Sequence, residues 1–240
     1  MYRLSMTGIA IASVIVVASP LQSGVGHYLA GLIEGDGSIK IPDNRVSSSG
    51  RWRYPTITIA FALKDLPLAQ LLASIFLGKI SRGTKDNPGN YYVLTINRLA
   101  SLYVIATLLN GNMRRPKIEA LHRLIAWFNA YSAESGSKQK FPPLTALGLD
   151  TSPFNTNRWL AGFLDADSNF LITFQLNADL LATQVQLYMR ISQRQVYGHR
   201  VSALPTSYIP FMEGLANFLS ASFSLFTRER VNRKGLSCTS

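Results

Sequence analysis

The chain carries one short pattern twice, and this repetition limits its possible fold more than any other feature. The segment "HYLAGLIEGDGSI" runs from His27 to Ile39, and "RWLAGFLDADSNF" runs from Arg158 to Phe170. Each copy is an apolar stretch with helical spacing that ends in acidic residues and then passes into a strand-like alternation. We therefore expect two similar units, each opened by a helix that leads directly into a sheet.

The residues after each copy predict the same order of elements, about 130 residues apart. In the first unit the order is helix, two strands, helix, two strands and two closing helices, and the second unit repeats it as helix, two strands and helix. The expected strands are 38–41, 54–63, 79–82, 91–96, 169–174 and 183–194, and the further helices are 68–76, one ending near 111, one starting near 116, and 210–223.

Four segments follow from this order. They are an apolar leader at 1–26, a first repeat at 27–131, a linker at 132–157 and a second repeat at 158–240. The linker is rich in Ser, Pro, Gly and Asn. The apolar run 8–19 is too short for a bilayer span of about 20 residues. The leader can be signal-like, translated upstream sequence or a segment packed on the body.

The charge of the chain favours an anionic partner. Lys and Arg together number 24 against 13 Asp and Glu, which gives a net charge of +11. Nucleic acid is the first candidate and an anionic membrane surface the second, although a protein can also be merely basic. The single cysteine excludes an intramolecular disulfide framework and a cysteine-rich zinc site.

Each motif helix has two small residues four positions apart, a spacing that lets helix backbones approach closely. These expected interface residues are Gly31, Gly35, Gly162 and Ala166. Two such helices packed on each other bring their C-terminal acids together: Glu34 and Asp36 from one copy, Asp165 and Asp167 from the other. Gathered carboxylates at helix C-termini are disfavoured by mutual repulsion and by the helix dipole.

A divalent cation removes both penalties, and oxygen ligands are those that Mg²⁺ prefers. Acids from two symmetric units can hold metals about 4 Å apart, a spacing suited to in-line attack of water on phosphodiesters. These four acids are therefore candidate ligands for a divalent cation, with Mg²⁺ or Mn²⁺ as the expected cofactor. The alternative is a pair of core helices with solvated acidic ends.

One face of the predicted sheets carries polar side chains and no acids. In the second unit this row is Gln184, Gln186, Tyr188, Arg190 and Arg194, and in the first it is Ser38, Lys40, Tyr54, Thr56, Thr58 and Lys64. Gln and Arg are the side chains that read adenine and guanine edges in the major groove. We predict that these rows bind DNA; a solvated sheet face is the alternative.

The two motifs resemble the LAGLIDADG family of homing endonucleases, in its single-chain, two-repeat form. "LAGLIEGDG" matches the nine-letter name at seven positions and "LAGFLDADS" at six. The resemblance implies an α+β fold of two pseudosymmetric αββαββα repeats, with antiparallel, saddle-shaped sheets over DNA. It also implies that Asp36 and Asp167 bind the catalytic metals, with Gly35 and Ala166 beside them in the site.

The resemblance further implies a basic residue near each active site, at the start of the helix that follows the fourth strand. Lys117 holds that position in the first repeat, where it can neutralise charge on the phosphate. Its counterpart in the second repeat would lie beyond Ser240. We therefore expect an incomplete second repeat that lacks its last strand and closing helices, and weakened cleavage of one DNA strand.

The sequence thus predicts an intron-encoded, site-specific double-strand DNA endonuclease. Two alternatives stay open: an RNA-binding maturase that promotes splicing of its host intron, and an inactive endonuclease remnant. The expected partners are a double-stranded DNA site and host intron RNA, and the expected state is a monomer without an obligate protein partner. The resemblance implies an organelle, the mitochondrion rather than the chloroplast.

Overall fold

The computed structural model describes residues 22–44, 46–84, 87–134, 136–137, 139–197, 206–228 and 233–239. The chain divides into two compact units, Met1–Gly162 and Phe163–Ser240, and each is described by itself. No helix in these described ranges is long and apolar enough to cross a membrane. The expected apolar run 8–19 lies outside the described residues, whereas Gln22–Gly26 of the expected leader belong to the first helix.

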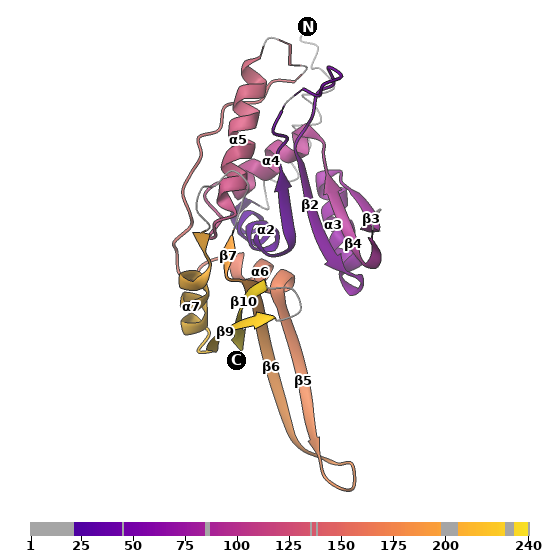
Figure 1. Ribbon diagram of the computed structural model, residues 1–240, viewed down its shortest axis with the longest axis vertical. Helices are drawn as coiled ribbons and strands as arrows, with labels where there is room; N and C mark the ends of the chain where they lie inside the picture. Colours follow the sequence, from indigo (N-terminus) through magenta and orange to yellow (C-terminus); the bar gives the residue numbers. More distant parts are fainter. Residues whose placement is uncertain are drawn as a thin grey trace. The chain divides into compact units, whose positions relative to one another are not determined.

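The first unit has the element order that the sequence predicts (Figure 1). Its elements are α2 (Gln22–Asp36), β1 (Gly37–Lys40), β2 (Thr56–Ala62), the 3₁₀ turn η2 (Leu63–Asp65), α3 (Leu66–Phe76), β3 (Lys79–Thr84), β4 (Asn87–Ile96), α4 (Leu99–Leu109) and α5 (Ile118–Ala133). The strands form one antiparallel sheet in the order β1-β2-β4-β3.

The core of the first unit follows from strand alternation and from apolar helix faces. In β2, Ile57, Ile59 and Phe61 are buried while the residues between them are half-exposed, as a sheet covered on one face requires. Helix α4 is buried on nearly every side, and it packs between α2 and α5. The motif helix α2 is therefore fixed inside the best-packed part of the unit.

The expected linker forms a strap along α4 and α5, and no helix or strand occurs in its described residues after Ala133. The side chain of Asn129 pairs with the backbone of Leu144 in both directions, at 2.8 and 2.9 Å. Asn110 does the same with Thr145 and Leu147, at 2.8 and 2.9 Å. These amide side chains replace the backbone pairing that a regular element would supply. We call residues 139–157 the strap.

The second unit repeats the sheet of the first. Its elements are the end of α6 (Trp159–Asp167), β5 (Ser168–Leu176), β6 (Ala182–Arg194), β7 (Val196–Tyr197), β8 (Thr206–Ser207), α7 (Ile209–Phe218), β9 (Ser222–Arg228) and β10 (Arg233–Thr239). The main sheet is antiparallel with the order β5-β6-β10-β9, and β7 pairs with β8. Both units are thus α+β, with four-stranded sheets of matching order.

The expectation that the second repeat lacks its last strand is wrong, because β10 pairs with both β6 and β9. The helix expected to reach Phe223 ends at Phe218. Ser220 has a left-handed φ of 51°, and the amide of Ala221 bonds to the carbonyl of Ala216 at 2.9 Å, which closes the helix. Enough chain then remains for two strands. The described residues of this unit contain no counterparts of α4 and α5.

The hairpin β5–β6 extends well past β9 and β10 in Figure 1. One of its faces carries apolar side chains that are largely exposed. Register places Phe170, Ile172 and Phe174 opposite Met189, Leu187 and Val185. Phe170 is 68 % exposed and Leu187 72 %. In the first unit the corresponding apolar face is buried, so the second sheet gains less stability from apolar burial.

Candidate functional site

Asp36 ends the first motif helix and is exposed. Gly37 follows it directly as the first residue of β1. A Cβ atom at Gly37 would lie 2.6 Å from the Cα of Ile33, so only glycine permits so abrupt a change from helix to strand. The sequence therefore fixes the Asp36 carboxylate at the junction of helix and sheet.

Lys117 lies at the same helix end. Its ammonium donates to the carbonyl oxygens of Ile33 at 2.9 Å, Glu34 at 2.8 Å, Gly35 at 3.3 Å and Gly37 at 2.8 Å. The last carbonyls of a helix have no partners within the helix and carry partial negative charge. The lysine thus caps the C-terminus of α2 around Asp36, which the sequence did not predict.

Glu34 points inward and does not join Asp36 in a cluster of acids. It is 1 % exposed, and it accepts from the amides of Arg114 at 3.1 Å and Arg115 at 2.7 Å and from the indole of Trp159 at 2.6 Å. Burial raises the pKa of Glu34 to about 6, although the charge of Arg115 and these hydrogen bonds act to lower it. It remains mostly ionised at pH 7 and has a structural partner for each oxygen.

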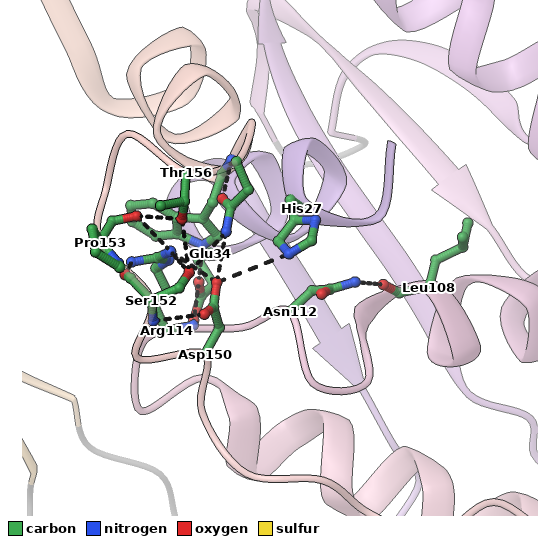
Figure 2. Close-up of polar contacts among 11 residues, drawn as sticks. His27, Glu34, Leu108, Asn112, Arg114, Asp150, Ser152, Pro153 and Thr156 are labelled. Carbon is green, nitrogen blue, oxygen red and sulfur yellow. Dashed lines mark hydrogen bonds and ion pairs between the residues drawn. The ribbon is translucent and has the colours of Figure 1, made fainter. Parts of the chain in front are cut away.

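Arg114 connects the strap to this region, as Figure 2 shows. Its guanidinium pairs with Asp150 at 2.8 Å and bonds to the carbonyl oxygen of Ser152 at 2.5 Å. It also lies 5.5 Å from the ring of Trp159 and 5.2 Å from that of Phe154, within cation–π distance.

Asp150 is the anionic member of this network. Burial acts to raise its pKa, but hydrogen bonds from Ser152 and Asn157 and the charge of Arg114 together hold the pKa below its usual value. Its amide also donates to the carbonyl of Met113 at 2.8 Å. The strap is therefore fixed to the first unit just before the second motif begins.

The second motif helix begins against the first. A Cβ atom at Gly162 would lie only 2.0 Å from the carbonyl oxygen of Tyr28 and 3.0 Å from the amide nitrogen of Leu32. Any side chain there would push the two backbones apart. The structure thus places one of the four expected interface residues at a direct backbone contact with α2, which also carries Gly31 and Gly35.

Asp167 ends α6 and is half-buried, and its carboxylate accepts a hydrogen bond from the side chain of Gln193 on β6. Asp165, at the position equivalent to Glu34, is exposed. Ala166 is half-buried between them. The first acid therefore differs in burial between the two copies of the motif: Glu34 is buried, and Asp165 is exposed.

The polar row of the first sheet contains most of the residues expected there. Register pairs Ser38 with Thr58 and Lys40 with Thr56, so these four share a face, while Lys64 is exposed on η2. Tyr54 departs from the expectation because it precedes β2. Its ring lies 6.2 and 6.4 Å from those of Trp127 and Tyr131 on α5, although 41 % of the residue remains exposed.

The polar row of the second sheet contains more residues than the sequence predicted, because strand β5 adds to the row on β6. Arg190 pairs with Asn169 and Gln186 with Thr173, so β5 contributes amide and hydroxyl groups that the reading of β6 alone missed. The alternation in "SNFLITFQL" was the available signal. The complete expected row on β6 is Gln184, Gln186, Tyr188, Arg190 and Arg194, of which Tyr188 donates a hydrogen bond to Gln186.

The donor set at each motif end suits a hard cation. In the described part of the chain, no group of three or more His, Cys, Asp or Glu side chains comes together, so the candidate ligands at each motif end are its terminal carboxylate and backbone oxygens. Asp36 is exposed. The carbonyl oxygen of Gly35 already accepts a hydrogen bond from the Lys117 ammonium at 3.3 Å, and its second lone pair can bind a metal. Oxygen ligands of this kind fit Mg²⁺, which retains several waters.

Comparison with known proteins agrees with this arrangement. Residues 29–128 match the family described as LAGLIDADG endonuclease. The chain is also 33 % identical to "Intron-encoded DNA endonuclease aI3" of Saccharomyces cerevisiae, over 86 % of this chain and 50 % of that protein. The chain belongs to the LAGLIDADG family. The chain is also 30 % identical to "Uncharacterized cox1 intron-2 37.2 kDa protein" of Schizosaccharomyces pombe, over 73 % of this chain and 48 % of that protein.

This LAGLIDADG chain therefore spans about half the length of the curated relatives it matches. Among solved structures, the meganuclease I-SmaMI bound to uncleaveable DNA has a TM-score of 0.54 at 17 % identity, with 90 % of this chain and 78 % of that chain covered. The I-LtrWI LAGLIDADG homing endonuclease bound to target DNA gives 0.51 at 16 %, with 90 % and 78 % covered. At such identities the likeness shows the shared LAGLIDADG fold alone.

Proposed function

We propose that the chain is a site-specific endonuclease that hydrolyses both strands of a DNA site with a divalent metal, Mg²⁺ or Mn²⁺. One observation carries the proposal. Asp36 and Asp167 each end a motif helix, and each is followed without a gap by the first strand of a sheet whose polar row lacks acids. Each carboxylate would then lie at the edge of the surface that we propose binds DNA.

Asp36 and Asp167 are the proposed metal ligands, with the backbone oxygens of Gly35 and Ala166 beside them. A bound divalent metal supplies Lewis-acid polarisation of the phosphate and an activated water. The protein supplies the rigid helix ends that hold the ligands. It also supplies Lys117, whose charge we propose stabilises negative charge on the phosphate as the bond breaks.

The proposed partner is double-stranded DNA. Amide and guanidinium groups on β6 and hydroxyl groups on β1 and β2 are suited to base edges in the major groove. Lys40 and Lys64 are exposed beside them and suit phosphates. The net charge of +11 adds sequence-independent attraction that weakens with salt. Both I-SmaMI and I-LtrWI are described as bound to DNA, which supports this partner.

Two further features belong to the proposal. Both motifs lie in one chain, which supports a monomer without an obligate protein partner. The relatives' names, one intron-encoded and one from a cox1 intron, support an intron-encoded protein acting in the mitochondrion.

The test begins with a duplex selected for binding from a randomised pool and cloned into a supercoiled plasmid. The chain should cut this plasmid with Mg²⁺ and not with EDTA. Asp36→Asn and Asp167→Asn should abolish cutting while duplex affinity stays within about threefold, because removing an acid reduces repulsion with phosphate. Cutting by either variant would contradict the metal assignment. Host intron splicing that tolerates both changes, without any DNA cutting, would instead identify a maturase.

A further inference from the structure

We infer that Trp159 is a positioning residue, whose indole bond to Glu34 fixes the start of the second motif helix to the first unit and so sets where Asp167 is presented. The inference rests on the proposed nuclease function for its catalytic consequence. The bond itself is a structural statement that can be tested without cleavage.

The contact is buried and short. Trp159 is fully buried, and its indole nitrogen donates to a Glu34 oxygen at 2.6 Å across 125 residues of sequence. The backbone amide of Trp159 is held by the side chain of Asn157 at 3.0 Å. Both the indole and the helix start are therefore fixed, and Gly162 one turn later touches α2 directly.

The acceptor is itself immobile. The backbone amides of Arg114 and Arg115 also donate to the Glu34 carboxylate, so the oxygen that accepts from the indole belongs to a group already bonded to the backbone of the same unit. The Arg114 guanidinium lies over the Trp159 ring and pairs with Asp150 of the strap. One tryptophan therefore contacts the first motif helix and lies beside the arginine that anchors the strap.

A small tilt of α6 at Trp159 would displace Asp167 at the other end of the helix. Trp159 and Asp167 are the first and last residues of α6, about 12 Å apart along a helix that rises 1.5 Å per residue. A tilt of about 5° at the start then moves the far end by about 1 Å. Displacements of that size at a catalytic group can cost about 100-fold in rate.

The two motifs differ in burial at this position: Glu34 is buried, and Asp165, its equivalent in the second motif, is exposed. The chain also offers a matched control. Trp127 is buried in the same unit, and within the described residues its indole nitrogen has no hydrogen-bond partner. Trp127→Phe removes the same atoms as Trp159→Phe without breaking a hydrogen bond.

The experiment compares the full-length chain with Trp159→Phe, Trp127→Phe, Glu34→Gln and the Trp159→Phe/Glu34→Gln double variant, well below their melting temperatures. Trp159→Phe should lower the cleavage rate about tenfold or more and raise the Mg²⁺ concentration for half-maximal rate, with duplex affinity within about threefold. Trp127→Phe should change none of these. The double variant should lose no more than the worse single variant, since both substitutions act on the same hydrogen-bonded group: Trp159→Phe removes the indole donor, and Glu34→Gln replaces one carboxylate oxygen by an amide donor.

A second readout is independent of cleavage. In an ¹⁵N spectrum, the three tryptophans give three indole signals, and Glu34→Gln should shift that of Trp159 and leave that of Trp127 in place. Trp159→Phe with normal rate and Mg²⁺ dependence would overturn the positioning role, even if its melting temperature fell. If Trp159→Phe does not fold, Glu34→Gln carries the same expectation. A wild-type chain that never cuts would overturn the nuclease proposal, while the indole signal would still decide whether the bond exists.

Discussion

The ammonium nitrogen of Lys117 lies 2.8 Å from the carbonyl oxygen of Gly37, the residue that follows Asp36. The same nitrogen bonds to carbonyls of the last turn of α2. A lysine that precedes α5 therefore sets the conformation of the motif end 80 residues earlier. In the proposed mechanism, the Lys117 ammonium and the Asp36 carboxylate both act at the C-terminal end of α2.

Replacing Lys117 should affect both stability and cleavage. Lys117→Ala leaves several helix-end carbonyls without their cation, and should lower the free energy of unfolding by about 1–2 kcal/mol. It should also slow cleavage, so that nicked plasmid accumulates over linear product. Urea unfolding and gel analysis measure the two effects. Lys140→Ala is the control, because its ammonium bonds to the carbonyl oxygen of Ser132 at 2.6 Å at the end of α5 and has no role in the proposed site. An equal loss of cleavage in this control would contradict the assigned role.

The two equivalent motif acids should differ in their effect on stability. Glu34→Ala leaves the buried amides of Arg114 and Arg115 without acceptors, and each such group costs about 1–3 kcal/mol. We expect a loss of about 3 kcal/mol in the free energy of unfolding. Asp165→Ala, at the exposed counterpart, should change it by less than about 0.5 kcal/mol. Similar losses for both variants in urea unfolding would contradict the burial difference.

The pair of Arg114 and Asp150 predicts a pH dependence. Folding lowers the pKa of Asp150 from 3.8, so its contribution to stability is present above pH 3.8 and is lost as pH falls through the lower folded value. The stability difference between wild type and Asp150→Asn should therefore be constant near neutrality and shrink below pH 3.8. Urea midpoints from pH 3 to 7 measure it. A stability difference that grows as the pH falls would contradict the prediction, because it would mean that folding raises the pKa of Asp150.

The two faces of the β5–β6 hairpin should respond differently in DNA binding. Arg190→Gln removes a cation from the polar row and should weaken duplex binding and reduce its salt dependence, by a slope of about 1 if Arg190 contacts a phosphate. Leu187→Thr alters the opposite, apolar face of the same strand and should leave affinity within about twofold. Titrations at several salt concentrations distinguish them. A larger effect from Leu187→Thr would place the DNA on the other face.

Individual helices and strands of the fold were predictable because they depend on patterns among residues close together in sequence. The alternation around Ile57 and Ile59 and the glycine after Asp36 depend on neighbours in sequence. The order of helices and strands along the first unit followed from these patterns. The family resemblance then placed Lys117 near the motif, although its contacts with the helix carbonyls were not foreseen.

The missed features depend on distant parts of the chain. The bond from Trp159 to Glu34 joins residues 125 positions apart, and no spacing rule predicts it. The strap read as a linker because its amide clamps, such as Asn129 with Leu144, leave no periodic signal. The last strand was missed because an early helix end at Ser220, through a left-handed backbone, is weakly marked in sequence.

The central claim is that the Asp36 and Asp167 carboxylates bind divalent metal together at the DNA backbone. Crystals of the chain with its selected duplex, grown with Mn²⁺, test it by anomalous scattering. We expect manganese peaks within about 2.2 Å of oxygens of both Asp36 and Asp167 and of a DNA phosphate. Manganese bound elsewhere, with these two carboxylates far from each other and from the DNA, would contradict the account.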